Sequence, residues 1–586
     1  MQGKRRIQRL LSIALSLVFA VALLAGCGAS GTDGTQGTTA AQDGTAAGTT
    51  AAPEKPVVEL SMMQNWVTLD NQEGIANDRI KKYLEDKMKI KLEIICPADS
   101  SQYYEKLKLY LSSGDAPDII NDAFDATFVV TAQQEDLLYD MGAAVAQKPD
   151  AYPTLNKIFN DPLQKFLNDV KFSDPNKNFA VWSMSNIVNP WAGAVVYNGK
   201  VLKDLNLSQP KTVEEYINLL REIKKGNKDV IPMGARVDKG NLIGILSPVF
   251  FRTYGVDPLE ITADASGNYV DTSITDTAKE CWKQLQSFYK EGLIDKEILT
   301  NESVDKVTDN FTSGKYATFV SNNPGANGNG YSWLFGKFKE INKDAVPGVD
   351  MLIDESPLTG PGGMANVPLG EMDICGTNTV IYKNSKNVER ALEVLNYLMS
   401  DEGQLLKWYG VEGIHYTKNA DGSINFNKEE FMKEVVIYQP GETVRHEWAP
   451  FTDLTAQLYF QIDKAKDLRD AIANSQPLIL NSYVEDNDIN KYCVPIGTTF
   501  AKEAQLQPVY EVLANNFLTE DQRAIKNKVE ELKKKWYAAF LVNQKNVDVE
   551  WDNFVKEVKA AGLDQLVQIK NDGVKAIKAK YDSAFK

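Results

Sequence analysis

Tryptophans and planar polar side chains recur together in the predicted loops of this chain, and these residue types suit a carbohydrate ligand. Sugars stack their apolar C–H faces on aromatic rings, and their hydroxyl groups bond to carboxylates and amides. The candidate stacking platforms are Trp66, Trp182, Trp191, Trp333 and Trp448. The candidate polar partners are Asn65, Asp122, Asp125, Glu412 and His415.

Each of these residues also has a purely structural interpretation. Any of the five tryptophans could equally pack in a core, and Glu412 and His415 could brace a hinge without touching a ligand. The other tryptophans are expected in the core: Trp282, Trp408, Trp536 and Trp551. The chain has nine tryptophans and 24 tyrosines, but a large α/β protein needs aromatic side chains for its core as well, so composition does not decide the question.

Strands and helices alternate in the first part of the chain, and this order predicts where the polar loops lie. Apolar runs at 57–62, 90–95 and 119–120 favour strands, with helical periodicity between them. Such alternation is typical of a parallel sheet, in which ligands bind beyond the carboxyl ends of the strands. The segments 63–66 and 121–125 follow two of these strands and contain four of the candidate residues.

The segment from Asn178 to Tyr216 predicts a crossing between two sheets. Two short apolar runs, Phe179–Trp182 and Ala194–Tyr197, favour strands on either side of a loop. We expect the first run in one lobe, the second run in another lobe, and Ser183–Gly193 as the hinge. Trp191 lies in this hinge, so a carbohydrate site there would need its ring to face the gap between the lobes.

The N-terminal residues predict export and attachment to a membrane. Basic residues precede an apolar run over 10–25, which is shorter than the roughly 20 residues that span a bilayer. Leu24–Cys27 resembles a bacterial lipobox, which implies cleavage of residues 1–27 before Cys27 and acylation of that cysteine. Residues 28–56 are too poor in apolar side chains to fold, so we expect a tether. The predicted location is the extracytoplasmic face of the bacterial cell membrane.

Composition and motifs argue against several classes of function. A net charge of −15 argues against a nucleic-acid partner. The cysteines after Cys27 are scattered, so neither a metal site nor a disulfide framework is predicted. A surface-anchored glycoside hydrolase needs two carboxylates, which 79 acidic residues supply by chance alone. Because the chain has two histidines, no H-E-x-x-H and no G-x-S-x-G, we expect it not to be an enzyme.

Several short motifs, in this order behind the lipobox, resemble a known family. They are SSGDAPDII (Ser112–Ile120), FAVW (Phe179–Trp182), VVYNGKVL (Val195–Leu202), PKTVEEY (Pro210–Tyr216), YKEGLIDKEILT (Tyr289–Thr300), FTSGKYATFV (Phe311–Val320) and GVEGIHY (Gly410–Tyr416). Nearly the whole mature chain resembles the extracellular solute-binding proteins of bacterial ABC importers, in the carbohydrate-associated group. The last motif is similar to that of the longer members that bind oligosaccharides, the alginate-oligosaccharide binders among them.

This resemblance implies an α/β, two-lobed periplasmic-binding-protein-like fold of type II, with a ligand cleft between the lobes and extra C-terminal helices. By analogy, residues 57–188 and 346–400 form lobe 1, and residues 189–345 and 401–586 form lobe 2. The implied function is capture of an oligosaccharide by hinge closure and delivery to the permease subunits of an ABC importer, by a monomer. The alternative is a ligand-presenting sensor or an adhesin lipoprotein with the same fold.

The resemblance also raises the question of calcium. Alginate binders of this kind carry a calcium loop before their FAVW-like strand, and Asp174, Asn176 and Asn178 have the 1, 3, 5 spacing of such oxygen ligands. Pro175 interrupts this spacing, and Ser185 stands where such a loop would place a carboxylate. We therefore expect a plain polar turn and no cofactor, with calcium as the weaker alternative.

Overall fold

The computed structural model describes most of the chain from Lys55 onward. The described residues, some of them as backbone only, are 55–64, 72–95, 102–121, 126–184, 189–191, 193–235, 242–300, 304–322, 329–361, 369–371, 374–434, 488–503, 505–506, 508–516 and 518–585. The chain divides into Met1–Lys55 and a compact unit, Pro56–Lys586, to which the described fold belongs. The predicted signal segment, with Cys27, and the tether up to residue 54 lie outside these ranges. None of the helices described has the length and apolar character that a membrane crossing requires.

The first sheet has five strands in the order β2-β1-β3-β13-β4. Their bounds are β1 Val58–Met63, β2 Ile90–Ile95, β3 Ile119–Ile120, β4 Ala180–Met184 and β13 Ile374–Ile381. β1 runs parallel to β2 and to β3, which confirms the predicted parallel arrangement. β13 lies antiparallel to β3 and β4, because it returns from a crossing segment and enters the sheet from the opposite end.

Helices surround the first sheet, and local signals in the sequence explain where they begin and end. The Asp78 carboxylate accepts hydrogen bonds from the backbone N–H groups of Ile80 and Lys81 and so caps α3. Gly114 ends α4 with φ of 80°, a conformation that favours glycine. These helices are α2 Gln72–Asn77, α3 Arg79–Met88, α4 Tyr103–Ser113, α5 Ala126–Gln134, α6 Met141–Gln147, α7 Pro153–Phe159, α8 Pro162–Phe172, α15 Val388–Leu398 and α16 Asp401–Tyr409.

The second sheet has four strands in the order β11-β6-β10-β7 and a hydrophobic core of its own. Its strands are β6 Gly193–Asn198, β7 Ile231–Ala235, β10 Tyr316–Asn322 and β11 Met351–Ile353. Thr212 and Glu215 form a capping box at the start of α10. The helices of this body are α9 Gly199–Asp204, α10 Val213–Gly226, α11 Leu242–Phe250, α12 Asp276–Glu291, α13 Val304–Thr312 and α14 Asn329–Ile341.

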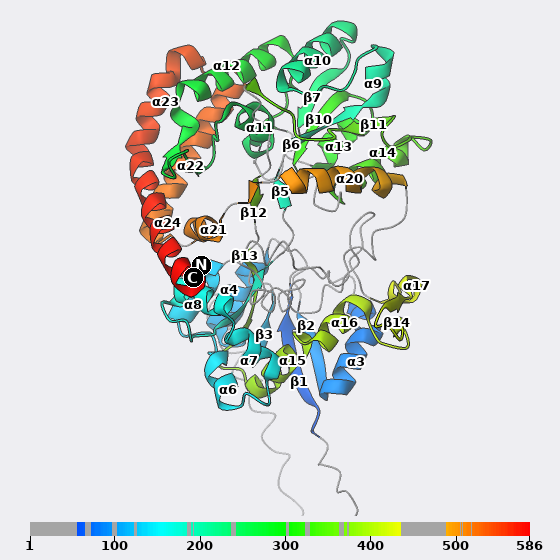
Figure 1. Ribbon diagram of the computed structural model, residues 1–586, viewed down its shortest axis with the longest axis vertical. Coiled ribbons are helices and arrows are strands. Elements are labelled where there is room, and N and C mark those ends of the chain that lie inside the picture. The colour runs from blue at the N-terminus through cyan, green and yellow to red at the C-terminus, as the bar shows by residue number, and fades with distance from the viewer. Residues whose placement is uncertain are drawn as a thin grey trace, which may run out of the picture. The chain divides into compact units, whose positions relative to one another are not determined.

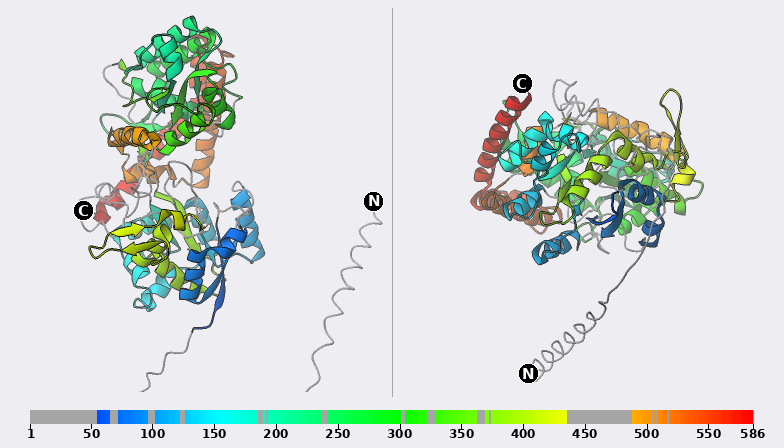
Figure 2. Two further views of the ribbon diagram at one scale, coloured as in Figure 1. Left: turned by 90° about the vertical axis from the view of Figure 1, so that its right-hand side faces the viewer. Right: turned by 90° about the horizontal axis from the view of Figure 1, so that it is seen from below.

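A third, smaller sheet is built from the segments that cross between the two bodies. Its strands, in the order β16-β12-β5, are β5 Asn189–Trp191, β12 Leu369–Glu371 and β16 Gln505–Leu506. Figures 1 and 2 show the two larger sheets in separate bodies, with β5 and β12 labelled between them in Figure 1. β4 belongs to the first sheet and β6 to the second, so the predicted crossing between them is confirmed.

The C-terminal part of the chain is helical, as the sequence predicts. Its helices are α20 Asp488–Glu503, α21 Val509–Asn516, α22 Glu520–Leu541, α23 Val547–Ala561 and α24 Leu563–Phe585. The tryptophans assigned to the core from the sequence are buried, Trp408 in the core of the first sheet and the other three in the core of the second: Trp282, Trp536 and Trp551.

The division between the two lobes differs from the expected one at three places, one of which is α24, whose Val574 and Ile577 were expected in lobe 2 and lie in the core of the first sheet. Met351–Ile353, expected in lobe 1, pairs as β11 with β6 of the second sheet. The segment 401–431, expected in lobe 2, contributes Leu406, Trp408 and Phe431 to the core of the first sheet. The reason is that α16 follows α15 after only two cap residues, Met399 and Ser400, and packs beside it instead of crossing.

Candidate functional site

The carboxyl ends of the strands in the first sheet meet at the edge from which the chain crosses to the second sheet. Met63 pairs with both Ile95 and Ile120, so β1, β2 and β3 end side by side. Met184, at the end of β4, pairs with Ile374, at the start of β13. Because β13 runs antiparallel to β3, its start lies at this same edge. The loops that carry candidate ligand residues therefore begin beside the crossing segments.

A buried network of uncharged side chains ties this edge together. The Asn121 Nδ2 group donates to Gln64 Oε1 (2.6 Å), and the Thr379 hydroxyl donates to Asn121 Oδ1 (2.8 Å). The Tyr103 hydroxyl donates to the backbone carbonyl of Asn121 (2.5 Å). Buried amides require such partners, and here they join β1, β3, β13 and α4.

This network fixes the roots of two predicted ligand loops. Gln64 is the last described residue before the segment 65–71, and Asn121 is the last before 122–125. The candidates in those segments lie outside the described residues: Asn65, Trp66, Asp122 and Asp125. Their role in binding stays a prediction, and the network supplies a rigid, uncharged base from which both loops start.

The second sheet presents its loops at the edge where the crossing segment enters. Gly193, at the start of β6, pairs with Asn322, at the end of β10. β10 runs parallel to β7, with Val320 opposite Ala235, so β7 ends at this edge too. In both sheets, the loop-bearing edge is thus the one at which crossing segments attach.

Besides Trp66, three further candidate tryptophans lie where their side chains are not described. Trp191 is in β5, where it pairs with Leu369 of β12, and Trp333 is in α14. Trp448 lies outside the described residues. The position of Trp191 in the crossing sheet agrees with the predicted hinge, and the direction of its ring stays open to test.

The prediction of Trp182 as a stacking platform is wrong. The side chain is fully buried in the first core, where its ring stacks on Phe172 with centroids 5.6 Å apart. Its indole N–H donates to Asn168 Oδ1 (2.7 Å). Residue 182 is turned toward α8, and a buried indole needs a partner for its N–H group, which Asn168 of that helix supplies.

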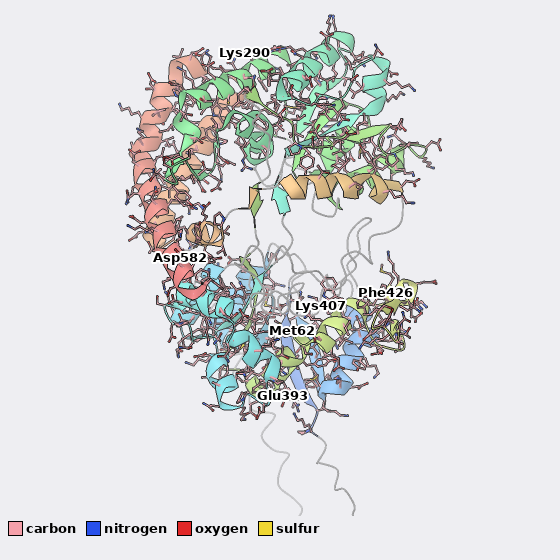
Figure 3. All side chains as sticks on the ribbon, viewed as in Figure 1. Met62, Lys290, Glu393, Lys407, Phe426 and Asp582 are labelled. Atoms are coloured by element: carbon pink, nitrogen blue, oxygen red, sulfur yellow. The ribbon has the colours of Figure 1, made fainter. Side chains whose placement is uncertain are left out.

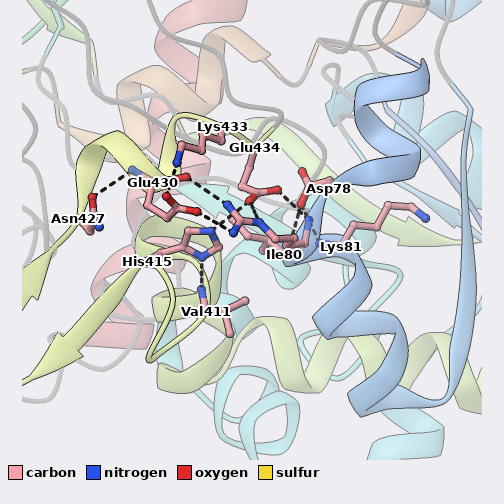
Figure 4. Close-up of polar contacts among 10 residues, drawn as sticks. Asp78, Ile80, Lys81, Val411, His415, Asn427, Glu430, Lys433 and Glu434 are labelled. Atoms are coloured by element: carbon pink, nitrogen blue, oxygen red, sulfur yellow. Dashed lines mark hydrogen bonds and ion pairs between the residues drawn. The ribbon is translucent and has the colours of Figure 1, made fainter.

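His415 is also buried, so it does not face a ligand. The backbone N–H of Val411 donates to Nδ1 (2.8 Å), which leaves the proton on Nε2, and Nε2 donates to Glu434 Oε1 (3.2 Å). Glu434 also accepts from the backbone N–H (2.7 Å) and the guanidinium of Arg79 (Figure 4). Burial lowers the pKa of His415, so the ring is held neutral.

The contacts around His415 hold α3 and residues 410–434 together. A Cβ atom on Gly410, whose φ is 79°, would lie 2.5 Å from His415 Nδ1, so a side chain there would clash. Glu412 is exposed and pairs with Lys418 (3.4 Å). His415 is therefore structural, as the sequence allowed, but it connects parts of the first body and does not brace a hinge. Glu412 as a ligand residue stays a prediction.

The calcium alternative has no support in the described turn. The Asn178 side-chain oxygen accepts hydrogen bonds from Gln164 Nε2 (3.1 Å) and Asn168 Nδ2 (2.7 Å), so it faces the core. Asp174 instead accepts from the backbone N–H of Asn176 (3.0 Å) within the turn. Across the described part of the chain, no group of three or more His, Cys, Asp or Glu side chains could hold a metal ion.

A buried carboxylate anchors the crossing segments in the second body. Asp354 Oδ2 accepts from the backbone N–H of Val195 (2.8 Å), and Oδ1 accepts from the Tyr197 hydroxyl (2.6 Å). Burial raises the pKa of Asp354 to about 7. Asp354 lies between β11 and β12, and Val195 lies in β6, just after β5. Asp354 therefore joins two crossing segments where they meet the second sheet.

Sequence reasoning placed the two predicted ligand loops at the ends of strands in the first sheet but did not find the residues that hold them. Gln64 and Asn121 each follow an apolar strand directly, and that position was the available signal. Thr379 lies inside β13, and Asp354 follows a strand of three residues. Neither position has a pattern from which its buried bonds could be foreseen.

Comparison with known proteins decides the family of this chain. Residues 72–405, more than half of the 586, match the family model described as bacterial extracellular solute-binding protein. The chain belongs to this family. Among curated relatives, this solute-binding protein is 23% identical over 535 residues to the fructooligosaccharide ABC transporter substrate-binding protein FusA of Streptococcus pneumoniae serotype 4. That match covers 80% of this chain and 82% of the relative.

Solved structures show that the solute-binding protein has the two-lobed fold of the family. An HMO-binding, ABC-transporter-associated solute-binding protein from Bifidobacterium longum infantis superposes with a TM-score of 0.60 at 16% identity, covering 89% of this chain and 99% of that one. The alginate-binding protein AlgQ2, solved without calcium ion, gives a TM-score of 0.53 at 17% identity over the same shares. These relatives are named as binding proteins, not as enzymes.

Proposed function

We propose that this solute-binding protein captures an oligosaccharide beside its crossing segments and delivers it to the permease of an ABC importer. The observation that carries the proposal is geometric. In a chain of this family, the loop-bearing edges of both large sheets adjoin the segments that build the sheet β16-β12-β5. A ligand that contacts loops from both lobes binds the closed arrangement better than the open one and so shifts the balance toward closure.

The chemistry at the root of the loops favours a neutral oligosaccharide. The buried Gln64, Asn121 and Thr379, whose amide and hydroxyl groups bond to one another, bring no positive charge to this edge, and the loop candidates Asp122 and Asp125 add acidic side chains. A net charge of −15 over the chain also repels a polyanionic sugar. FusA is named for a fructooligosaccharide, a neutral sugar, and AlgQ2 for alginate, an acidic one. The relatives therefore include proteins named for each class, and the choice for this chain is between a neutral and an acidic oligosaccharide.

A screen of oligosaccharides by thermal shift tests the proposal. A ligand that binds only the folded protein raises the melting temperature, so neutral oligosaccharides should raise it at concentrations where their monosaccharides do not. Alginate oligosaccharides of matched length serve as the acidic arm. A larger shift with the acidic arm would overturn the neutral assignment, and no shift with any oligosaccharide, followed by no heat in calorimetry, would overturn the proposed function.

The tryptophan platforms are tested once a ligand is known. Trp66→Ala and Trp191→Ala should each weaken binding by about 1 to 3 kcal/mol if the ring stacks on the sugar. Trp551, buried in the second core, is the matched control: Trp551→Phe should lower stability and leave affinity intact. Unchanged affinity in a stable Trp66 or Trp191 variant would remove that residue from the site.

We further propose that lipid on Cys27 holds the protein at the extracytoplasmic face of the membrane, as a monomer on its tether. The lipobox-like Leu24–Cys27 and the apolar run before it support this proposal. In cells, the wild-type protein should partition into detergent and incorporate labelled palmitate, while Cys27→Ser should do neither. Equal detergent partitioning of both proteins would contradict lipid attachment at Cys27.

A further inference from the structure

One helix, α24, belongs to the hydrophobic cores of both lobes. Near its start, Leu563 lies in the second core and Leu566 packs against that core. Further along, Val574 and Ile577 lie in the first core. Figure 1 shows α24 as one unbroken red helix, and Figure 3 labels Asp582 near its end and Lys290 on α12 of the second body. The two lobes are therefore connected by the continuous helix α24 as well as by the crossing strands.

The C-terminal half of α24 is held firmly on α8 of the first lobe. The ring of Phe166 packs edge-to-face against Tyr581 and Phe585, with centroids 5.7 Å and 5.6 Å apart. The Lys580 ammonium pairs with the Asp169 carboxylate (2.9 Å) and donates to its backbone carbonyl (2.8 Å). Any movement of the second lobe must therefore be taken up before this half of the helix.

The middle of α24 is held by polar contacts. The Lys570 ammonium donates to the backbone carbonyl of Glu511 (3.0 Å). The Asn571 side chain accepts from the Tyr269 backbone N–H (3.0 Å) and donates to its carbonyl (2.9 Å). A cavity of about 40 Å³ adjoins this stretch, lined on its charged side by Glu260, Asp271, Lys526, Glu530, Lys533 and Lys570. Polar contacts beside a cavity give way more easily than interlocked apolar side chains.

Gly573 stands where the helix passes from one core to the other, and nothing in the packing requires a glycine there. A Cβ atom at this position would meet only Ala514 Cβ, at 3.7 Å, which is ordinary contact. Gly573 is not among the residues with positive φ, so its backbone suits alanine. Glycine in a helix interior is destabilising because it leaves the backbone freer to move. The sequence thus puts a flexible residue at the boundary where alanine would fit.

We infer that Lys570–Gly573 is the flexure of α24, the point at which this helix bends when the two lobes move. The halves on either side keep their packing, and the polar contacts to Glu511 and Tyr269 adjust around the bend. The role of this bending in ligand capture rests on the proposed function. The bending itself does not, because it is a property of the ligand-free protein.

Hydrogen–deuterium exchange on the ligand-free, full-length protein tests the flexure directly. Backbone amides at 571–577 should exchange faster than those in the flanking turns of α24, at 566–569 and 578–582. Gly573→Ala should slow exchange on both sides of the boundary and raise the melting temperature. Protection that is uniform along α24 in the wild-type protein would overturn the inference, whether or not the protein binds a sugar.

Ligand kinetics test the consequence, with a matched pair of variants. Gly573→Ala should slow ligand association several-fold, because a stiffer helix resists the bend. Ala576→Gly, at an exposed position within the half held by the first lobe, should lower the melting temperature and leave the association rate unchanged. Equal association rates for Gly573→Ala and wild type would overturn the flexure, whereas a wild-type protein that binds no oligosaccharide would contradict the proposed function and leave the exchange test standing.

Discussion

A buried histidine in the first lobe and a buried aspartate in the second respond to pH in opposite directions. His415 and Asp354 are 0% and 1% exposed. Burial lowers the pKa of His415 and raises the pKa of Asp354 to about 7. The cause is the same in both, because removal of water disfavours the charged form, and the charged form of a base is the protonated one.

The surroundings of the two side chains explain why each lobe tolerates its buried group. Around His415, the carboxylate of Glu434 is already paired with the guanidinium of Arg79, and that positive charge also lowers the pKa of His415. Around Asp354, the partners Val195 and Tyr197 are uncharged donors. The first lobe thus contains a matched set of charges, and the second contains a carboxylate stabilised by hydrogen bonds alone.

These pKa shifts fix the sign of the pH dependence for each lobe. The folded pKa of Asp354 lies above the unfolded value of about 3.9, so its contribution to stability is present at low pH and is lost as pH rises through about 7. The folded pKa of His415 lies below the unfolded value of about 6.5, so stability is lost as pH falls below that value. The two lobes therefore weaken at opposite ends of the range.

The largest expected effect comes from Asp354→Asn. A shift from about 3.9 to about 7 corresponds to up to about 4 kcal/mol of stability lost between pH 4 and pH 8. The asparagine variant cannot lose a proton, so its stability should change far less over this range. Urea unfolding at pH 4.5, 6 and 8 measures the difference.

The matched control for this prediction is Asp344→Asn, at an exposed aspartate shortly before β11. It should keep the wild-type pH dependence. Asp354→Asn should start slightly less stable at low pH, because an amide can accept only one of the two hydrogen bonds from Val195 and Tyr197. A wild-type protein whose stability does not fall between pH 5 and pH 8 would contradict the assignment to Asp354.

Arg79→Met tests the paired charges of the first lobe. It removes the guanidinium from Glu434, which is 3% exposed in its side chain, and should cost about 3 kcal/mol. It should also move the pKa of His415 upward, because the positive charge of Arg79 lowers that pKa. Unfolding midpoints measure the first effect, and NMR titration of the imidazole measures the second. Lys148→Met, at an exposed pair with Glu389, is the control and should change neither.

Asn121→Ala tests the uncharged network at the first sheet edge. It leaves the buried Gln64 amide and the Thr379 hydroxyl without a partner, which should cost about 2 kcal/mol at every pH. If Asn121 positions the ligand loops, affinity should fall as well, while Asn553→Ala on the exposed face of α23 should change neither quantity. A loss of stability that depends on pH would show that the network is not uncharged.

Local signals in the sequence predicted much of the fold because they act within a few residues. The crossing between β4 and β6 was foreseen from two short apolar runs, and the helix ends at the Thr212 capping box and at Gly114 follow from residues close together in the sequence. The lobe assignment of 401–431 failed, because no local pattern shows which sheet a helix such as α16 packs against.

The candidate site was less predictable because its side chains meet across long separations in the chain. Asn121 bonds to Gln64 and to Thr379, which lies more than 250 residues away. Trp182 and His415 have residue types suited to a ligand, and their burial became apparent only with Asn168 and Glu434 in place. Residue type marks what a side chain can do, and three-dimensional neighbours decide what it does.

The smallest expected effect on the pH dependence is that of His415→Asn, which lowers stability at every pH through the lost Nε2 bond to Glu434 and also changes the slope of the pH profile. The asparagine oxygen can still accept from the backbone N–H of Val411, as Nδ1 does, and the side chain cannot gain a proton. The loss of stability below pH 6.5 should therefore become shallower than in wild type, in urea unfolding at pH 5, 6 and 7. In the double variant with Asp354→Asn, the loss of stability at low pH and the loss at high pH should each become shallower. The two changes should be independent, because the two residues lie in different lobes. A double variant whose pH profile departs from the sum of the single variants would show that the two lobes are coupled.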